Sequence, residues 1–284
     1  MNDFGLTAGI PDERYHGATE VLSSTGARKV LACPARFRWE RANPPGAKRA
    51  FDFGKLAHRL VLGEGPEICV VDAPDWRSKA AQEQRNAAYA AGLVPVLAAE
   101  FEAAGALRDS VYAHDTARDL FKAGAAELSG FWTDEATGTA LRFRPDWMTR
   151  LDGRPVCVDV KTTVSADPKE FGRSVLKFGY HQQARWYLDG LHAHSVEGAR
   201  FLFVAVEKQP PYCVSVIELD GDALAEGARL NRKAIDLYAR CIESGIWPAY
   251  GHHIHTISLP PWAARAAVQA DADLLISQLE GITA

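Results

Sequence analysis

The segment PVCVDVKTT, at residues 155–163, constrains the fold most strongly because apolar and polar side chains alternate along it. Successive side chains of a β-strand point to opposite faces, so the three valines share one face while Asp159 and Lys161 share the other. The valines would pack into a core. Asp159 and Lys161, about 6.6 Å apart along the strand, would then face a common space. The pattern therefore predicts a half-buried strand with an Asp-x-Lys pair on its polar face.

Two β-rich segments precede this strand, LSGFWTD and TALRFRPDWMTR, and the turn-forming sequences EATG and LDGR separate the three. Their spacing predicts an antiparallel three-strand meander. Two further strands are expected in FLFVAVE and YCVSVIEL. Helical patterns cover residues 21–32, 53–63, 78–91, 95–121, 179–192 and 222–244. This mixture predicts an α/β or α+β fold with a central mixed β-sheet flanked by helices.

A length of 284 residues, 47% of them hydrophobic, suits one large domain or two small ones, and the absence of repeats favours one domain over residues 1–284. We expect a helical N-terminal part over about 18–122, a sheet core over about 126–220, and a C-terminal helix and tail over about 222–284. No apolar run approaches the roughly 18 residues that a membrane helix needs, and the start of the chain lacks a secretory pattern. These features predict a cytoplasmic protein without a membrane partner.

Charge is unevenly distributed along the chain. Residues 26–60 contain nine basic and two acidic residues, a net charge of +7, which leaves −11 on the rest of a chain whose total is −4. Such a segment is a candidate for contact with a phosphate backbone, and Arg36, Arg38 and Arg41 are its candidate DNA-binding residues. The alternative is an ordinary solvated helical face.

Further carboxylates precede the Asp-x-Lys strand. Pro145 has no N–H for a sheet ladder, so it marks an edge or bend at which Asp146 turns out of regular pairing. If the meander is in register, Glu127, Asp146 and Asp159 converge with Lys161 alone to balance them. Like charges at this density need a counter-ion, and a divalent cation with oxygen ligands, such as Mg²⁺, meets that need.

The chain also resembles a known family. RPDWMTR followed by VDVKTT resembles the Pro-Asp…Asp-x-Lys core of the PD-(D/E)xK nuclease superfamily. LSSTGARKVLACPARFRWER and FGKLAHRLVLG resemble the Ser-rich helix with Cys-Pro-x-x-Phe and the Gly-x-x-x-His helix of RecB-like nucleases. AELSGFW, YHQQARWY and WPAYG…ISLPPWA resemble segments of the phage-type RecE exodeoxyribonuclease VIII group. The resemblance implies a restriction-endonuclease-like core.

Residue by residue, the resemblance implies that Asp146, Asp159, the Val160 carbonyl and His58 ligate Mg²⁺, for which Mn²⁺ would substitute. Lys161 would orient or polarise the attacking water, and its alternative role is to neutralise Asp159. Glu127 would be an additional carboxylate near the metal; its alternative is a solvated residue at a strand end.

Gln183 and Tyr187 share a helix face, where they would contact DNA or brace the site. Tyr187 also fits a core stripe with Tyr180, Ala184 and Leu188, so packing is an alternative role for it.

The function implied is a Mg²⁺-dependent deoxyribonuclease, specifically a 5′-to-3′ double-strand exonuclease of phage or prophage type that acts in recombination in the bacterial host cytoplasm. The alternatives are a structure- or sequence-specific endonuclease and a non-catalytic DNA-binding accessory. Double-stranded DNA ends are the expected partner, with a single-strand annealing protein and a homo-oligomeric ring as candidates. No Walker-type segment occurs, so ATP-driven unwinding would need another protein.

Overall fold

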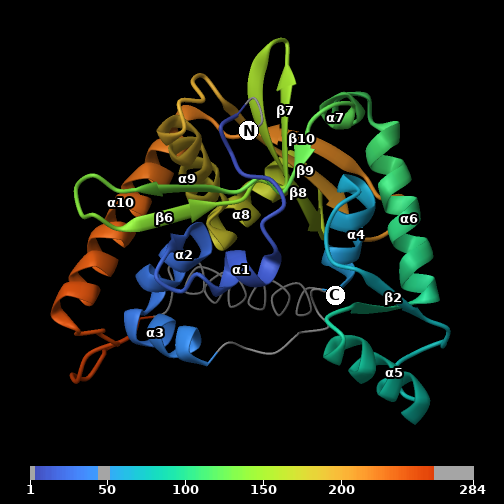
Figure 1. Ribbon diagram of the computed structural model, residues 1–284, viewed down its shortest axis with the longest axis horizontal. Helices are drawn as coiled ribbons and strands as arrows, with labels where there is room; N and C mark the ends of the chain where they lie inside the picture. Colours follow the sequence, from blue (N-terminus) through green and yellow to red (C-terminus); the bar gives the residue numbers. More distant parts are fainter. Residues whose placement is uncertain (1–3, 44–51, 259–284) are drawn as a thin grey trace, which may run out of the picture. The chain divides into compact units, whose positions relative to one another are not determined.

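The computed structural model describes residues 4–43 and 52–258 of the chain and is centred on a five-stranded mixed sheet (Figure 1). The strands, in the order β10-β9-β8-β7-β4, are β10 (Val214–Glu218), β9 (Arg200–Glu207), β8 (Arg154–Thr163), β7 (Trp147–Leu151) and β4 (Ala125–Ala126). Strands β8 and β9 are parallel, and the other neighbours are antiparallel. The long alternating strand predicted from the sequence thus lies at the centre of the sheet.

Ten helices are described: α1 (Asp12–Gly17), α2 (Ser24–Ala32), α3 (Pro34–Ala42), α4 (Asp52–Leu62), α5 (Lys79–Ala90), α6 (Ala98–Ala113), α7 (Asp115–Phe121), α8 (Pro168–Phe178), α9 (Tyr180–Ala193) and α10 (Gly221–Ser244). Gly179 ends α8 in the left-handed conformation, with φ of 67°, and α9 starts directly after it. This backbone turn suits glycine because it has no Cβ.

Each face of the central sheet packs against a different set of helices. Val156, Val158 and Val160 are at most 2% exposed and share a core with apolar residues of α4, α6 and α7. Cys157 and Phe203 belong to the opposite core, which includes apolar residues of α2, α8, α9 and α10. The predicted central mixed sheet flanked by helices is therefore confirmed.

The predicted three-strand meander is wrong. Residues 139–150 form two strands, β6 (Ala140–Phe143) and β7, which belong to different sheets. Strand β6 lies between β1 (Leu22–Ser23) and β5 (Gly130–Thr133), whereas β7 pairs with β8 and β4. The break spans Arg144, Pro145 and Asp146, and a proline lacks the N–H that a continuous ladder requires.

The single helix expected over residues 95–121 is also wrong. Its first residues form β3 (Val94–Leu97), which pairs with β2 (Ile68–Val71), and the remainder is divided between α6 and α7. β-Branched valines on both sides of Pro95 favour an extended start. His114 separates the helices because its side chain accepts a hydrogen bond from the Ala117 N–H and caps α7.

The described residues up to Ala249 belong to one compact unit, and a second unit starts at Tyr250. The predicted helix over 222–244 is confirmed as α10. Of the second unit, residues 250–258 are described and form no helix or strand, and residues 259–284, with the end of the ISLPPWA motif, lie outside the described residues. None of the helices in the described ranges is both long and apolar enough to span a membrane.

The packing of α9 against α10 depends on Gly227, where a Cβ would lie 2.3 Å from the carbonyl oxygen of His181. Gly227→Ala is expected to destabilise the protein by about 2–3 kcal/mol, because the helices must separate. Gly172→Ala is the matched control, since nothing lies within 4 Å of its added methyl group. That control should stabilise α8 by about 0.5–1 kcal/mol. Urea unfolding measures both, and equal midpoints would contradict the packing account.

Candidate active site

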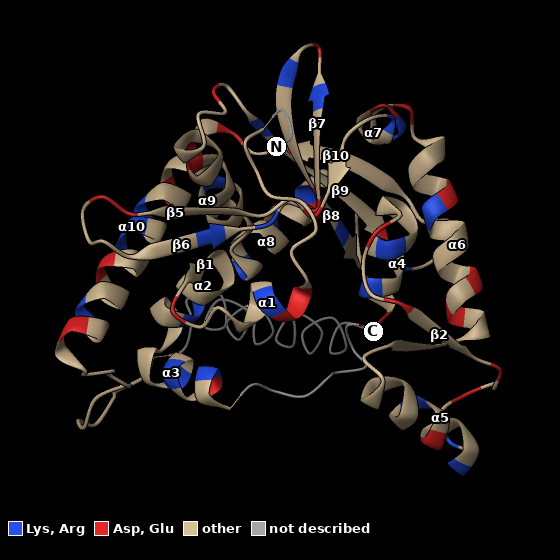
Figure 2. Ribbon diagram, viewed as in Figure 1, with Lys and Arg blue, Asp and Glu red and all other residues tan. Residues whose placement is uncertain are grey.

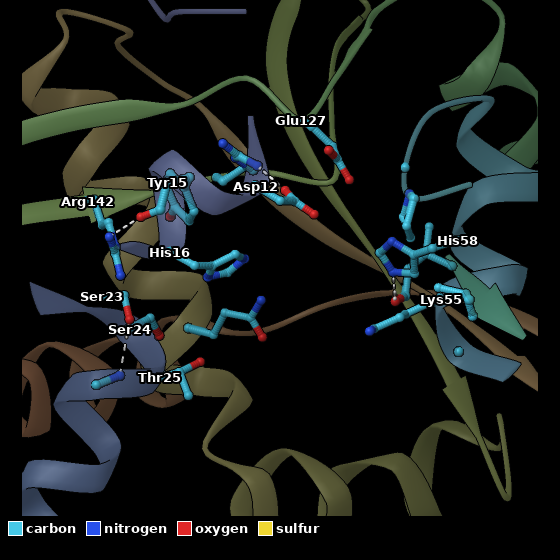
Figure 3. Close-up of a pocket in the computed structure, with 18 of the residues that line it drawn as sticks. Asp12, Tyr15, His16, Ser23, Ser24, Thr25, Lys55, His58, Glu127 and Arg142 are labelled. Carbon is cyan, nitrogen blue, oxygen red and sulfur yellow. Dashed lines mark hydrogen bonds and ion pairs between the residues drawn. The ribbon is translucent and has the colours of Figure 1, made fainter. Parts of the chain in front are cut away.

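A cavity of about 880 Å³ is lined by residues of α1, α2, α4, β6, β8 and α9 (Figure 3). Six Lys or Arg residues and three Asp or Glu residues line it. Figure 2 shows basic positions on α3 and α4, within the segment that the sequence marked as positively charged. Two further basic residues of that segment, Lys48 and Arg49, lie outside the described residues. The charged residues of the cavity wall are thus mainly cationic.

Strand register places three carboxylate residues in one row. Ala126 is opposite Trp147, and Trp147 is opposite Val158. The next residue of each strand in this register is Glu127, Asp146 and Asp159, respectively, so these three form the adjacent row. The Glu127 N–H donates to the Asp146 carbonyl at 3.1 Å. The break at Pro145 therefore turns Asp146 toward the edge of β8.

His58, Asp146 and Val160 meet where β8 continues beyond the end of its pairing with β7. The Val160 N–H donates to Asp146 Oδ2 at 2.8 Å. His58 Nε2 lies 3.1 Å from the same carboxylate oxygen and 3.0 Å from the Val160 carbonyl oxygen. Helix α4 places His58 here because Ala57 and Val61, its neighbours on the helix, pack into the same core as Val160.

Charge pairing shifts the pKa values of His58 and Asp146. Burial alone would lower the pKa of His58, but the Asp146 carboxylate and the Val160 carbonyl raise it to about 9. Burial opposes ionisation of Asp146, yet His58 and Lys161 hold the pKa of this carboxyl below its ordinary value. At neutral pH, the metal-free site therefore contains an imidazolium paired with a carboxylate.

Asp159 and Lys161 form a second buried pair on β8. Lys161 Nζ lies 2.5 Å from Asp159 Oδ2, and Gln183 Nε2 donates to Asp159 Oδ1 at 2.5 Å. Asp159 is 1% exposed, and burial raises its pKa although Lys161 opposes this. Burial would lower the pKa of Lys161, but Asp159 and Asp146 raise it. Tyr180 faces the ammonium group with its ring centroid 4.9 Å away, so Lys161 is held as a positioned cation.

Glu127 lines the same cavity as His58. Its backbone has a left-handed φ of 49°, unusual for a residue with a side chain. Burial, together with the carboxylates of Asp12 and Asp146, raises its pKa, while Arg144 and His58 act in the other direction. Its carboxyl is therefore half-buried between carboxylates and cationic groups, and burial makes the largest contribution to its raised pKa. Its role remains a prediction.

The other predicted site residues lie in different surroundings. Tyr187 lines the cavity, but its ring also packs against Phe143 and Phe201, so packing and site contact coexist. Arg41 also lines the cavity, and it donates to the Tyr238 hydroxyl at 2.9 Å.

Arg36 and Arg38 are exposed on α3 and are not among the described residues that line the cavity. Their contact with DNA remains a prediction.

Two arginines of the cavity, the buried Arg142 and the partly buried Arg144, were not predicted as site residues. Arg144 donates to Ser129 Oγ at 2.9 Å and to Asp12 at 2.6 Å, and its guanidinium lies 3.9 Å from the Tyr15 ring centroid. Arg142 donates to the Tyr15 carbonyl and stacks on the same ring. The sequence could have indicated them, because both arginines alternate with apolar residues immediately before Asp146 and so share a strand face.

The residues at β8 and α4 suit a divalent cation. In the described part of the chain, no three His, Cys, Asp or Glu side chains lie close enough together to hold a metal. His58 Nε2 nevertheless lies 3.0 Å from the Val160 carbonyl oxygen and 3.1 Å from Asp146 Oδ2. Adjacent octahedral ligands at about 2.1 Å from Mg²⁺ lie about 3.0 Å apart. The carboxylate oxygen, the carbonyl oxygen and the imidazole nitrogen are all donors that a divalent cation accepts, so this set of three fits such an ion.

A family model described as a PDDEXK-like domain of unknown function (DUF3799) matches residues 23–260. A crystal structure of a presumed exonuclease from Eubacterium rectale matches with a TM-score of 0.61 and 14% identity, over 89% of this chain and 96% of that chain. The structure of SSO0001 matches with a TM-score of only 0.32, at 14% identity over 86% of this chain and 91% of that one. No curated protein matches the sequence.

Proposed function

The chain belongs to the family of PDDEXK-like domains, and we propose that it is a Mg²⁺-dependent deoxyribonuclease. The observation that carries this proposal is the junction at β8, where His58, Asp146 and the Val160 carbonyl meet. The Asp159–Lys161 pair lies on the same strand. This arrangement supports hydrolysis of a phosphodiester more directly than binding alone, because a binding surface has no need of a buried, paired Asp-x-Lys.

By the resemblance, four groups would hold the cation: Asp146, His58 and the Val160 carbonyl, which meet at β8, and Asp159, which is paired with Lys161 in the metal-free structure. When bound, Mg²⁺ supplies a Lewis acid and a water molecule of lowered pKa. His58 must lose its proton to become a ligand, so cation binding would release that proton. Gln183 fixes Asp159 through its amide donor. Lys161 keeps its proton and would donate a hydrogen bond to the attacking water or to a phosphate oxygen.

The substrate that we propose is duplex DNA, degraded from its ends in the 5′-to-3′ direction. The mainly basic wall of the cavity supports a polyanionic substrate. The resemblance to the RecE group, at the Glu127 and Gln183 motifs, supports the exonuclease form. The proposal extends to a role in recombination of phage type, beside a single-strand annealing protein, with a ring-shaped homo-oligomer as the assembly.

Cleavage of labelled DNA tests the proposal. The purified protein is incubated with 5′-labelled, 3′-labelled and covalently closed circular duplex in Mg²⁺ or EDTA. We expect Mg²⁺-dependent loss of linear DNA alone, with nucleotides released from the 5′ end. Cutting of circles would indicate an endonuclease, and binding without cutting would indicate an accessory protein.

Asp146→Asn should reduce cleavage at least about a hundredfold, because it removes the charge that would hold the cation. The matched control is Asp109→Asn, whose carboxylate is exposed on α6 and pairs with Arg108. This control should cleave at the wild-type rate. Full activity of Asp146→Asn would overturn the assignment of the site.

A further inference from the structure

A second polar cluster lies in the cavity on the side opposite His58 and Lys55. Figure 3 shows Ser24, Thr25 and Arg142 together there. The pairing of β1 with β6 accounts for this arrangement, because Ser23 is the direct partner of Arg142. Helix α2 begins at the next residue, and Ser24 and Thr25 of its first turn line the same cavity as Arg142.

Two buried polar atoms of this cluster have no hydrogen-bond partner among the described residues. They are Oγ of Ser24, a residue 5% exposed, and Nε of Arg142, a residue 8% exposed. The guanidinium is held in place from one side, where Nη1 donates to the carbonyls of Tyr15 and Ala18. Burying polar groups without partners is unfavourable, so two such residues on the wall of one cavity indicate a ligand that carries acceptor oxygens.

The start of α2 supplies further donors. Ser23 caps the helix and accepts a hydrogen bond from the Gly26 N–H at 3.2 Å. The N–H groups of the first helical turn have no partners within the helix, and the helix dipole favours an anion there. No acidic residue occupies this first turn. A cation would be repelled at this position, whereas a phosphate would accept from backbone, hydroxyl and guanidinium together.

Two of the three acidic residues that line the cavity are neutralised by ion pairs. Glu40 lies 2.6 Å from Lys29, and Asp12 accepts from Arg144 at 2.6 Å. Each of these two acidic side chains of the cavity wall is therefore paired with its own cation. Arg142 makes its described hydrogen bonds with neutral carbonyls, so its charge is balanced by no carboxylate contact in the described residues.

We propose that Ser24, the first turn of α2 and Arg142 bind a phosphate group of the nucleic acid, separate from the phosphate that is cleaved beside His58. The proposal rests on the proposed function in one respect, which is that DNA enters this cavity. Two phosphates held on opposite sides would fix the register of the strand relative to Asp146 and Lys161. The bound group is either a terminal phosphomonoester or an internal phosphodiester.

Substitutions at Ser24 test the site without disturbing the contacts that hold Arg142. Ser24→Ala removes an unpartnered hydroxyl, so it should fold at least as stably as the wild type while binding DNA roughly tenfold more weakly. Ser24→Asp places a carboxylate at the helix start, which favours α2 but repels phosphate, and should weaken binding about a hundredfold. The matched control is Ser174→Asp on α8, outside the described cavity wall, which should bind nearly as well as the wild type.

Binding is measured in EDTA, so that no cleavage occurs, with duplexes that carry either a 5′-phosphate or a 5′-hydroxyl. Preference of the wild type for the 5′-phosphate, lost in Ser24→Asp, would identify a terminal group. Equal binding of both duplexes, weakened to the same degree in Ser24→Asp, would identify an internal one. Inorganic phosphate should raise the melting temperature of the wild type more than that of Ser24→Asp.

Equal DNA affinity of Ser24→Asp and Ser174→Asp would overturn the phosphate site. So would a wild-type protein that neither binds DNA in EDTA nor gains melting temperature from inorganic phosphate. The proposed function fails separately. Ser24-dependent binding by a wild-type protein that never cleaves DNA in Mg²⁺ would remove the nuclease and leave the phosphate site standing. Cleavage of DNA by the wild type, together with unchanged DNA binding in the Ser24 variants, would remove the phosphate site and leave the nuclease standing.

Discussion

Asp159→Asn is expected to abolish the rise in melting temperature that Mg²⁺ causes in the wild type, and to lower cleavage at least about a hundredfold. Asp159 is almost fully buried, and its carboxylate contacts Lys161 and Gln183. In EDTA the variant should melt close to the wild type, because loss of the pair with Lys161 is offset by loss of repulsion from Asp146. An undiminished Mg²⁺ shift in Asp159→Asn would contradict a metal site on β8.

Lys161→Met should behave in the opposite way. Removing the cation leaves the buried Asp159 carboxylate without its ion-pair partner, so the metal-free protein should lose about 3 kcal/mol of stability. Mg²⁺ should still bind and raise the melting temperature, while cleavage is lost for want of the positioned ammonium group. Lys169→Met, at an exposed position of α8, is the control and should resemble the wild type. A melting series in EDTA and graded Mg²⁺ separates the two roles.

The stability of the metal-free protein is expected to fall as the pH rises from about 6.5 to about 9. His58 has an ordinary pKa of 6.5 and a folded pKa of about 9, so its protonated form is stabilised in the fold. This contribution, at most about 3 kcal/mol, is fully present below pH 6.5 and is lost as the pH passes through 9. Urea unfolding in EDTA at several pH values measures it.

His58→Gln should remove this pH dependence, because glutamine keeps a donor for Val160 but has no charge to lose. The variant should also lose most cleavage in Mg²⁺ and regain part of it in Mn²⁺, which accepts mixed nitrogen and oxygen ligands. His192→Gln, at an exposed histidine of α9, should keep both the slope and the activity. A slope unchanged in His58→Gln would mean that another group titrates.

The sequence by itself determined the elements whose periodicity is local. Alternation set which face of β8 carries Asp159 and Lys161, because side chains of any strand alternate. The Asp152-Gly153 turn joins β7 to β8, as two positive φ angles at an Asp-Gly pair allow. The long apolar stripe of α10 and the position of Gln183 on α9 were likewise legible from helical spacing.

The tertiary structure alone decided how distant segments meet. Pro145 signalled a bend, but only packing sent β6 and β7 into different sheets. His58 reaches Val160 because Ala57 and Val61 pack onto the valine face of β8.

The parallel pairing of Ser23 with Arg142 joins residues far apart in the chain, and it brings the start of α2 to a buried arginine. Local periodicity contains no record of such pairings, because their free energy comes from burial between elements that are separated in sequence.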